Sequence, residues 1–239
     1  MAVSFLRRQR RSARSIFEPA RVSVTITKNE VLAMAQLNGT NANEVLDISS
    51  WGPPVLPATA HGVNGYGGDD TIYGSAYIDN LFGGDGNDTI YGNAGDDLIF
   101  GGNGNDTSYG GSGNDTILDA AGDDSLWGQA GNDTLWGGVG NDTYIFTAGD
   151  GIDTINDDKS PTGAAGYGGG TDLLYFGYNA SQLYLFQSGN DFLITTIADA
   201  SDGVMNEGVV IQDFFLGGNN VVEYLQTADN GVYDLTQVL

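Results

Sequence analysis

The sequence predicts an all-β fold, a two-sheet solenoid made of nine-residue half-turns, and three observations lead to this prediction. Rows of nine residues follow one another without a gap from Gly65 to Ile145. The sixth position of all nine rows is Asp, and the first and fourth positions are Gly in eight rows each. The eighth position is apolar or aromatic except at Ser108. A disordered glycine-rich linker has no reason to keep its apolar residues in one phase, so a repeat architecture is the better interpretation.

Each row supplies one turn and one short strand. Three residues make about 10 Å of strand, which points the eighth position inward and the seventh and ninth positions outward. The glycines permit the positive φ angles and the close backbone approach of a tight turn. Because the chain reverses its direction at each turn, alternate strands form two sheets, and one full coil takes eighteen residues.

The rows, such as GGDGNDTIY at 83–91 and GGNGNDTSY at 101–109, resemble the G-G-x-G-x-D-x-U-x nonapeptide of RTX (haemolysin-type) calcium-binding proteins. The resemblance implies a parallel β-roll, in which six residues of each row turn around calcium and three form the strand. It also implies a type I export machinery as a partner, an uncleaved C-terminal secretion signal and calcium-induced folding after export.

The spacing of the aspartates fits calcium. Aspartates eighteen residues apart lie on the same edge of the roll, about 4.8 Å from each other. Without a cation, such neighbours repel by about 1 kcal/mol at the dielectric of water, and by several times that near a protein surface. A Ca²⁺ ion that lies about 2.4 Å from an oxygen of each carboxylate removes this repulsion, whereas Mg²⁺ demands a smaller, near-octahedral shell. The first edge carries Asp70, Asp88, Asp106, Asp124 and Asp142, and the second carries Asp79, Asp97, Asp115 and Asp133.

The adjacent aspartate pairs on the two edges predict about seven calcium ions. A last calcium-like turn, at Gly151 and Asp153, adds one weaker site. The pair that uses Asp79 is the least regular, because Tyr77 and Ile78 replace the usual turn residues. Backbone carbonyls complete the roughly six to eight oxygens that calcium prefers. The candidate carbonyls are those of the fourth-position glycines Gly68, Gly86, Gly95, Gly104, Gly113, Gly122, Gly131 and Gly140.

The charge of the chain excludes several classes of partner. The sequence has 31 acidic and 8 basic residues, for a net charge of −23. Seven of the basic residues lie in the first 28 positions, and only Lys159 follows them. Such an acidic body repels nucleic acid and anionic membranes and attracts cations. The chain has no Cys, which excludes disulfides and thiolate metal sites, and no apolar run of the roughly eighteen residues that a membrane helix needs.

Shifts in composition divide the chain into four parts. The Arg-rich start lacks the apolar stretch of a secretory signal. It is interpreted as a disordered tail, or one that rests on the acidic body, in preference to a membrane- or nucleic-acid-binding arm; a misplaced start codon is a further alternative. Val22–Thr27 alternates like a strand, Asn29–Gln36 fits a short helix, and Asn38–Asp47 is an imperfect row with Glu44 in place of Asp. The predicted parts are a basic tail (1–21), an N-terminal cap with one degenerate repeat (22–64), the calcium-binding β-roll (65–146) and a β-rich C-terminal cap with a candidate secretion signal (147–239).

Four blocks after the array look like strands separated by turn residues: TDLLYFG, QSGNDFLITT, GVVIQDFFLG and VVEYLQTADNGVYDL. Together with GDGIDTI, they resemble the haemolysin-type C-terminal cap domain that follows such arrays. Gln187, where a basic residue would be expected, and the T-A-D-N-G loop depart from that pattern. The resemblance to the family thus covers residues 65–239.

No catalytic constellation is found in the sequence. The single histidine, His61, lies in a Pro/Gly-rich loop and is expected at the surface. Neither the H-E-x-x-H zinc signature nor a nucleophile elbow is present. The leading hypothesis is a secreted, extracellular protein that binds calcium, folds in response to it and has no catalysis of its own.

Two other functions stay open. The chain could be a non-catalytic fragment or accessory module of an RTX toxin or exoenzyme, because the sixty or so residues before the array are too few for those catalytic domains. It could also be an adhesive, surface-layer or glycan-binding protein, because outward-pointing aromatic rings can stack on a sugar or a protein partner. The ninth-position aromatic residues are Tyr73, Phe82, Tyr91, Phe100, Tyr109, Trp127 and Trp136.

Overall fold

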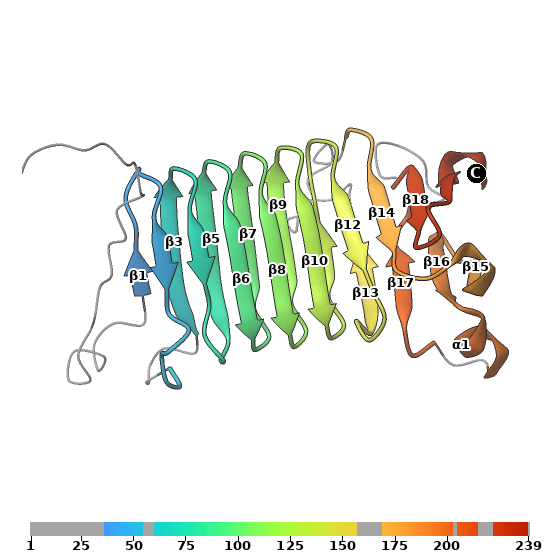
Figure 1. The fold of residues 1–239 in the computed structure, drawn as a ribbon, viewed down its shortest axis with the longest axis horizontal. Helices are drawn as coiled ribbons and strands as arrows, with labels where there is room; N and C mark the ends of the chain where they lie inside the picture. The colour runs from blue at the N-terminus through green and yellow to red at the C-terminus, as the bar shows by residue number, and fades with distance from the viewer. Residues whose placement is uncertain (1–35, 55–59, 157–168, 203–204, 215–221, 239) are drawn as a thin grey trace, which may run out of the picture.

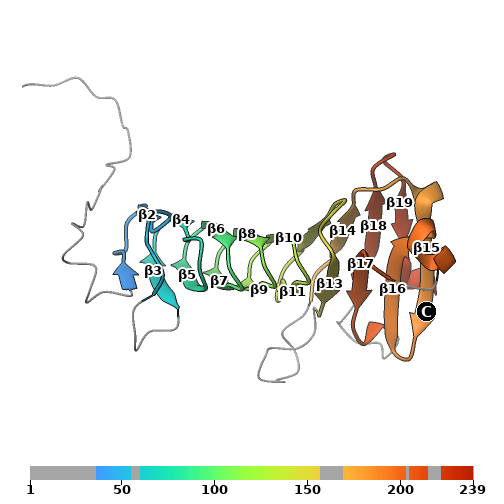
Figure 2. The ribbon, with the colours of Figure 1, turned by 90° about the horizontal axis from the view of Figure 1, so that it is seen from below.

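The computed structural model describes residues 36–54, 60–156, 169–202, 205–214 and 222–238. The predicted basic tail and the strand at Val22–Thr27 lie outside these ranges. So does the predicted helix at Asn29–Gln36, apart from Gln36, which begins a strand instead. The described strands form a ten-stranded and a nine-stranded sheet. Figure 2 shows the two sheets as two layers that run along the molecule.

From β1 to β14, successive strands of the chain alternate between the two sheets (Figure 1). The first sheet contains β1 (Gln36–Asn38), β3 (His61–Gly67), β5 (Asp79–Asp85), β7 (Leu98–Asn103), β9 (Thr116–Ala121), β11 (Thr134–Trp136) and β13 (Ile152–Ile155). The second contains β2 (Val45–Asp47), β4 (Thr71–Tyr73), β6 (Thr89–Ala94), β8 (Thr107–Ser112), β10 (Ser125–Ala130), β12 (Thr143–Phe146) and β14 (Leu173–Phe176).

The register confirms one coil per eighteen residues. Neighbouring strands of the repeat are parallel, and Leu81 pairs with Ile99, which pairs with Ile117. On the other sheet, Ile72 pairs with Ile90 in the same way. The fold is therefore the expected parallel β-roll of nine-residue half-turns.

The strands of the central coils are longer than the three residues expected. β6 to β10 each have six residues, which extend from the seventh position of one row to the third position of the next. In β6 and β7, two positions point inward, the apolar eighth and the first, which is glycine.

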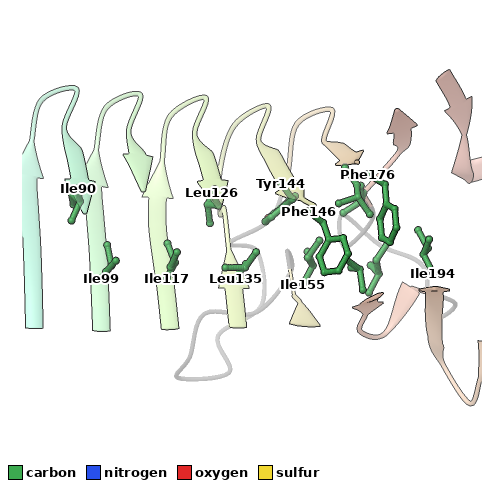
Figure 3. Close-up of a cluster of buried hydrophobic side chains, with 14 of the residues drawn as sticks. Ile90, Ile99, Ile117, Leu126, Leu135, Tyr144, Phe146, Ile155, Phe176 and Ile194 are labelled. Carbon is green, nitrogen blue, oxygen red and sulfur yellow. The ribbon is translucent and has the colours of Figure 1, made fainter. Parts of the chain in front are cut away.

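The hydrophobic core is a single row of eighth-position side chains between the two sheets. Ile90, Ile99, Ile117, Leu126 and Leu135 are at most 1% exposed, and Figure 3 shows this row along the roll. Each coil therefore contributes only two such side chains for eighteen ordered residues. A core this thin leaves the roll dependent on other interactions between the coils.

The C-terminal blocks form the strands that the sequence predicts. Parallel pairing continues from β12 through β14 to β18 (Tyr224–Thr227), and from β13 to β17 (Gly208–Ile211). The pairing then becomes antiparallel, through β16 (Asp191–Thr196) to β15 (Leu183–Ser188) and from β18 to β19 (Val232–Asp234). A short helix, α1 (Ile197–Asp202), and two short 3₁₀ segments, Ala180–Gln182 and Leu235–Val238, complete the described elements.

The core widens toward this end of the roll, where Phe146, Phe176 and Phe214 are buried. Antiparallel strands thus extend both sheets beyond the last parallel strands. Within the described residues, no helix is both long and apolar enough to cross a membrane.

The N-terminal row that the sequence predicts is also part of the roll. Val45 and Leu46 pair with Thr71 and Ile72, so Glu44 precedes its strand at the position of a repeat aspartate. β1 adds a further parallel strand beside β3. The first coil therefore begins before Gly65.

Candidate metal centre

The nine repeat aspartates lie in two buried ladders, one on each edge of the roll. Their exposed fractions are 0–2%. On the first edge, the backbone N–H of Asp70 donates to Oδ1 of Asp88 at 2.7 Å, and that of Asp88 donates to Oδ1 of Asp106 at 2.8 Å. On the second edge, Asp79 and Asp97 are joined in the same way at 2.8 Å. The remaining bonds of this kind join Asp106 to Asp124, Asp124 to Asp142, Asp97 to Asp115 and Asp115 to Asp133.

Both ladders continue beyond the nine rows. The backbone N–H of Asp133 donates to Oδ1 of Asp153 at 3.0 Å, which places the predicted last turn on the second edge. The backbone N–H of Asp142 donates to Oδ1 of Asp172 at 2.8 Å. Sequence reasoning missed Asp172, because thirty residues rather than eighteen separate it from Asp142. Its signal was the segment TDLLYF, in which Asp directly precedes a strand as it does in the rows.

Glutamates end the first ladder on both sides. The backbone N–H of Glu44 donates to Oδ1 of Asp70 at 2.7 Å, so Glu44 occupies the ladder position before the first aspartate. The backbone N–H of Asp172 donates to Oε2 of Glu223 at 2.7 Å. The first ladder thus consists of acidic residues from end to end.

His61 occupies the start of the second ladder, and the expectation that it lies at the surface is wrong. The residue is 4% exposed, and Nδ1 lies 3.0 Å from Oδ1 of Asp79 and 3.1 Å from Oγ of Ser75. The rings of Trp51 and Tyr77 meet it edge-on. The Pro-rich segment misled the prediction because it leads into β3, which adds a strand to the roll and buries its first residue.

In eight of the ladder aspartates, the second carboxylate oxygen is buried without a protein partner. Within the described part of the chain, Oδ2 accepts no hydrogen bond in Asp70, Asp88, Asp97, Asp106, Asp115, Asp124, Asp133 and Asp153. A buried, unpartnered carboxylate oxygen is costly because water no longer solvates it. A cation on each ladder would remove that cost.

The first-position glycines allow these oxygens to meet a backbone oxygen of the next coil. A Cβ on Gly83 would lie 2.3 Å from Oδ2 of Asp88 and 2.6 Å from the carbonyl oxygen of Gly101. A Cβ on Gly92 would lie 2.6 Å from Oδ2 of Asp97 and 2.3 Å from the carbonyl oxygen of Gly110. At these two positions a Cβ would collide with the carboxylate and carbonyl oxygens, so glycine is required. Sequence reasoning did not single out these first-position carbonyls.

The fourth-position glycines, whose carbonyls the sequence proposes as ligands, stack along the ladders. Gly86 and Gly104 have φ angles of 131° and 126°, which favour glycine. The carbonyl oxygen of Gly86 would lie 2.0 Å from a Cβ on Gly104. All eight proposed carbonyl oxygens face the glycine one coil later in this way: those of Gly68, Gly86, Gly95, Gly104, Gly113, Gly122, Gly131 and Gly140. Their role as calcium ligands stays a prediction.

Exposed Asn and Asp side chains form ladders of another kind along the fifth position of the rows. The backbone N–H of Asn105 donates to Oδ1 of Asn87 at 2.7 Å, and that of Asp123 donates to Oδ1 of Asn105 at 3.0 Å. These bonds point back to the preceding coil, whereas those of the aspartate ladders point forward. Such a turn is therefore hydrogen-bonded both to the preceding coil and to the next one. The signal was present in the sequence, since the fifth position is Asn or Asp in eight of the nine rows.

Burial raises the pKa of the ladder carboxylates. Loss of solvation is the main cause, and like charges on neighbouring carboxylates add to it. The pKa rises to about 8 for Asp97 and Asp124, and to about 7 for Asp106 and Asp133. Protons and cations therefore compete for these groups.

Side chains alone do not chelate an ion on these ladders. Across the residues that the structure describes, no three Asp, Glu or His side chains form a group that could hold a metal. An ion on either ladder would thus combine carboxylate oxygens of adjacent coils with main-chain oxygens of the turns. Calcium accepts such mixed, oxygen-only shells.

Gly92→Ala tests the need for glycine beneath the ladder. The new methyl group must displace the carbonyl of Gly110 or the carboxylate of Asp97, so we expect a loss of about 1–3 kcal/mol in the free energy of unfolding. Gly52→Ala is the control, because a Cβ there meets nothing within 4 Å. Denaturant unfolding at saturating calcium measures both, and equal stabilities would refute the close approach.

Comparison with known proteins agrees with the ladders and the register. A family model, the RTX calcium-binding nonapeptide repeat (four copies), matches residues 63–76, 73–108 and 109–144. No curated protein matches the chain. The family matches end at residue 144, so the haemolysin-type C-terminal cap stays a prediction. This chain therefore carries RTX calcium-binding nonapeptide repeats over residues 63–144.

Proposed function

We propose that this protein binds calcium along both aspartate ladders, that calcium drives the folding of the roll, and that the protein acts outside the cell without catalysis of its own. The observation that carries the proposal is the row of buried Oδ2 atoms without a hydrogen-bond partner among the described residues. Calcium fits better than magnesium because the available ligands are all oxygens in an irregular arrangement.

The extended ladders raise the expected number of ions. Aspartates of adjacent coils form five pairs on the first edge, which ends at Asp172, and four on the second, which ends at Asp153. One ion per pair gives about nine, against the seven or eight expected from the rows. At tenfold excess over its dissociation constant, each independent site adds roughly 1.4 kcal/mol to the free energy of unfolding. The sum of about 13 kcal/mol is comparable to the stability of a whole domain.

This energetic dependence supports an extracellular role. Where free calcium is scarce, as in a bacterial cytoplasm, the acidic repeats would stay unfolded and suited to export. Outside the cell, calcium would fold them and so make export irreversible. We propose a type I exporter as the partner in this step, in keeping with the repeat family and with the absence of Cys.

Calcium removal tests the proposal directly. With excess EGTA at neutral pH, we expect the far-UV circular dichroism of the roll to be lost, because the buried carboxylates lose their counter-ions. Restored calcium should recover the signal, whereas magnesium at the same concentration should not. A β-sheet signal that EGTA leaves unchanged would refute calcium-dependent folding.

The pH dependence of the calcium-free protein gives a second test. The folded-state pKa values of Asp97 and Asp124, about 8, lie above the ordinary value near 4, so folding takes up protons. The stabilising contribution is complete below about pH 4 and is lost as the pH rises through about 8. Toward about pH 5, where protons replace calcium on the ladders, the calcium-free roll should therefore be folded, and its melting temperature should fall as the pH rises toward neutrality.

Calorimetry measures how the melting temperature depends on pH, with protein from which a chelating resin has removed the calcium. A repeat at about 0.5 M KCl separates the buried ladders from the net charge, because salt screens mainly exposed groups. With calcium present, the dependence should weaken or reverse, since the ions hold the carboxylates ionised. A calcium-free melting temperature that rises with pH would contradict the assignment.

A stacked aromatic row favours binding of a glycan as a second candidate function. On the sheet of β4, β6 and β8, the rings of Tyr73 and Tyr91 stack at 5.0 Å, and those of Tyr91 and Tyr109 at 4.8 Å. Trp127 follows at 6.0 Å from Tyr109. These rings are half-buried and lie on the outer face of the sheet, where sugar rings could stack on them.

A glycan array tests the aromatic row. If the row is a binding surface, Tyr109→Ala should abolish a signal that the native protein gives. Phe100→Ala removes a matched stacked ring from the opposite sheet and should leave the signal intact. Equal losses in both variants would attribute the effect to stability rather than to a binding face.

A further inference from the structure

Asp79, the first aspartate of the second ladder, differs from the eight ladder aspartates whose Oδ2 has no partner. Its Oδ2 accepts the backbone N–H of Ser75 at 2.6 Å. Its Oδ1 accepts the hydroxyl of Ser75 at 3.1 Å and lies 3.0 Å from Nδ1 of His61. All three residues are buried. Protein groups therefore satisfy both carboxylate oxygens of Asp79.

The turn before Asp79 is built to hold these partners in place. Tyr77 stands at the fourth position, where the other rows have Gly, and its φ angle is not positive as theirs are. The backbone N–H of Tyr77 donates to Oγ of Ser75 at 3.2 Å, which fixes the hydroxyl beside the carboxylate. The rings of Trp51 and Tyr77 enclose the imidazole of His61 edge-on, with centroids at 5.3 and 6.2 Å. The irregular turn and the buried histidine are therefore one arrangement.

The first ladder begins with a similar arrangement. The backbone N–H of Thr40 donates to Oε2 of Glu44 at 2.6 Å, and the hydroxyl of Thr40 donates to Oε1 at 3.1 Å. Thr40 and Ser75 both lie four residues before the acid, at the second position of the row. None of the other eight rows from Gly65 to Ile145 has Ser or Thr at that position. A hydroxyl residue there thus accompanies a carboxylate that the protein itself satisfies.

We propose that Asp79 is not a calcium ligand, because Ser75 and His61 take the place of the ion in the first gap of the second ladder. The inference rests on the proposed calcium function. Hydrogen bonds already offset the cost of burying the Asp79 carboxylate, so an ion would have to displace them. Calcium on this ladder then begins between Asp97 and Asp115, whose Oδ2 atoms have no hydrogen-bond partner among the described residues. Without the pair of Asp79 and Asp97, one ion for each remaining aspartate pair gives about eight.

Calcium counting on two matched variants tests the proposal. Asp79→Asn and Asp70→Asn each neutralise the first aspartate of one ladder and keep its shape. Asp70 is the control because its Oδ2 is buried without a hydrogen-bond partner in the described part of the chain. In equilibrium dialysis of the full chain at saturating calcium, Asp79→Asn should bind as many ions as the native protein, and Asp70→Asn about one fewer. Equal counts for the two variants would overturn the inference and leave the proposed function intact.

The native protein provides a second test, which stays valid if either variant fails to fold. In crystals grown with calcium, anomalous scattering should show no ion within about 3 Å of the Asp79 carboxylate, whereas an ion should lie about 2.4 Å from Oδ2 of Asp70. Nδ1 of His61 should stay within hydrogen-bond distance of Asp79. An ion bound to Asp79 would overturn the inference alone. A native chain that binds no calcium would refute the proposed function and the inference together.

Discussion

Each coil of the roll is joined to the next by a buried carboxylate that has two tasks. One oxygen accepts a backbone N–H of the coil before, as Oδ1 of Asp88 does from Asp70. In eight of the ladder aspartates, Asp88 among them, the other oxygen is buried and unpartnered within the described structure. In these residues, protein groups solvate one carboxylate oxygen and leave the other to a cation or a proton. Because this arrangement is repeated along both edges, the stability of the fold depends on whether a cation or a proton occupies the place beside the second oxygen.

The other features of the repeat follow from this constraint. The first-position glycines exist because a Cβ on a residue such as Gly83 would occupy the space of the Asp88 carboxylate. Because that position is lost to side chains, the core is reduced to one apolar residue per strand, such as Ile90 or Ile99. The thin core makes the coils depend on their edges. The exposed Asn and Asp ladder, which includes Asn87 and Asn105, joins the same turns from the outside.

The features that could be predicted from the sequence are those that the nine-residue period determines. The eighteen-residue register and the two aspartate edges could be predicted because side-chain direction and turn spacing are periodic. Residues beyond an interruption could not, because an insertion hides the register: Asp172 follows its predecessor by thirty residues, and His61 joins the roll after a Pro-rich segment. The contact of Ser108 with Asp119 was hidden for another reason. Each is a visible exception to the repeat, but only the packing of the coils brings them together.

Crystals grown in calcium would test the ladders most directly, through anomalous scattering measured at a wavelength where calcium contributes. The account predicts one peak for each adjacent pair of ladder aspartates other than the pair of Asp79 and Asp97, beside Oδ2 of residues such as Asp88 and Asp115, with main-chain oxygens completing each shell. Ordered ladders whose Oδ2 atoms contact only water, with no anomalous peaks, would contradict it.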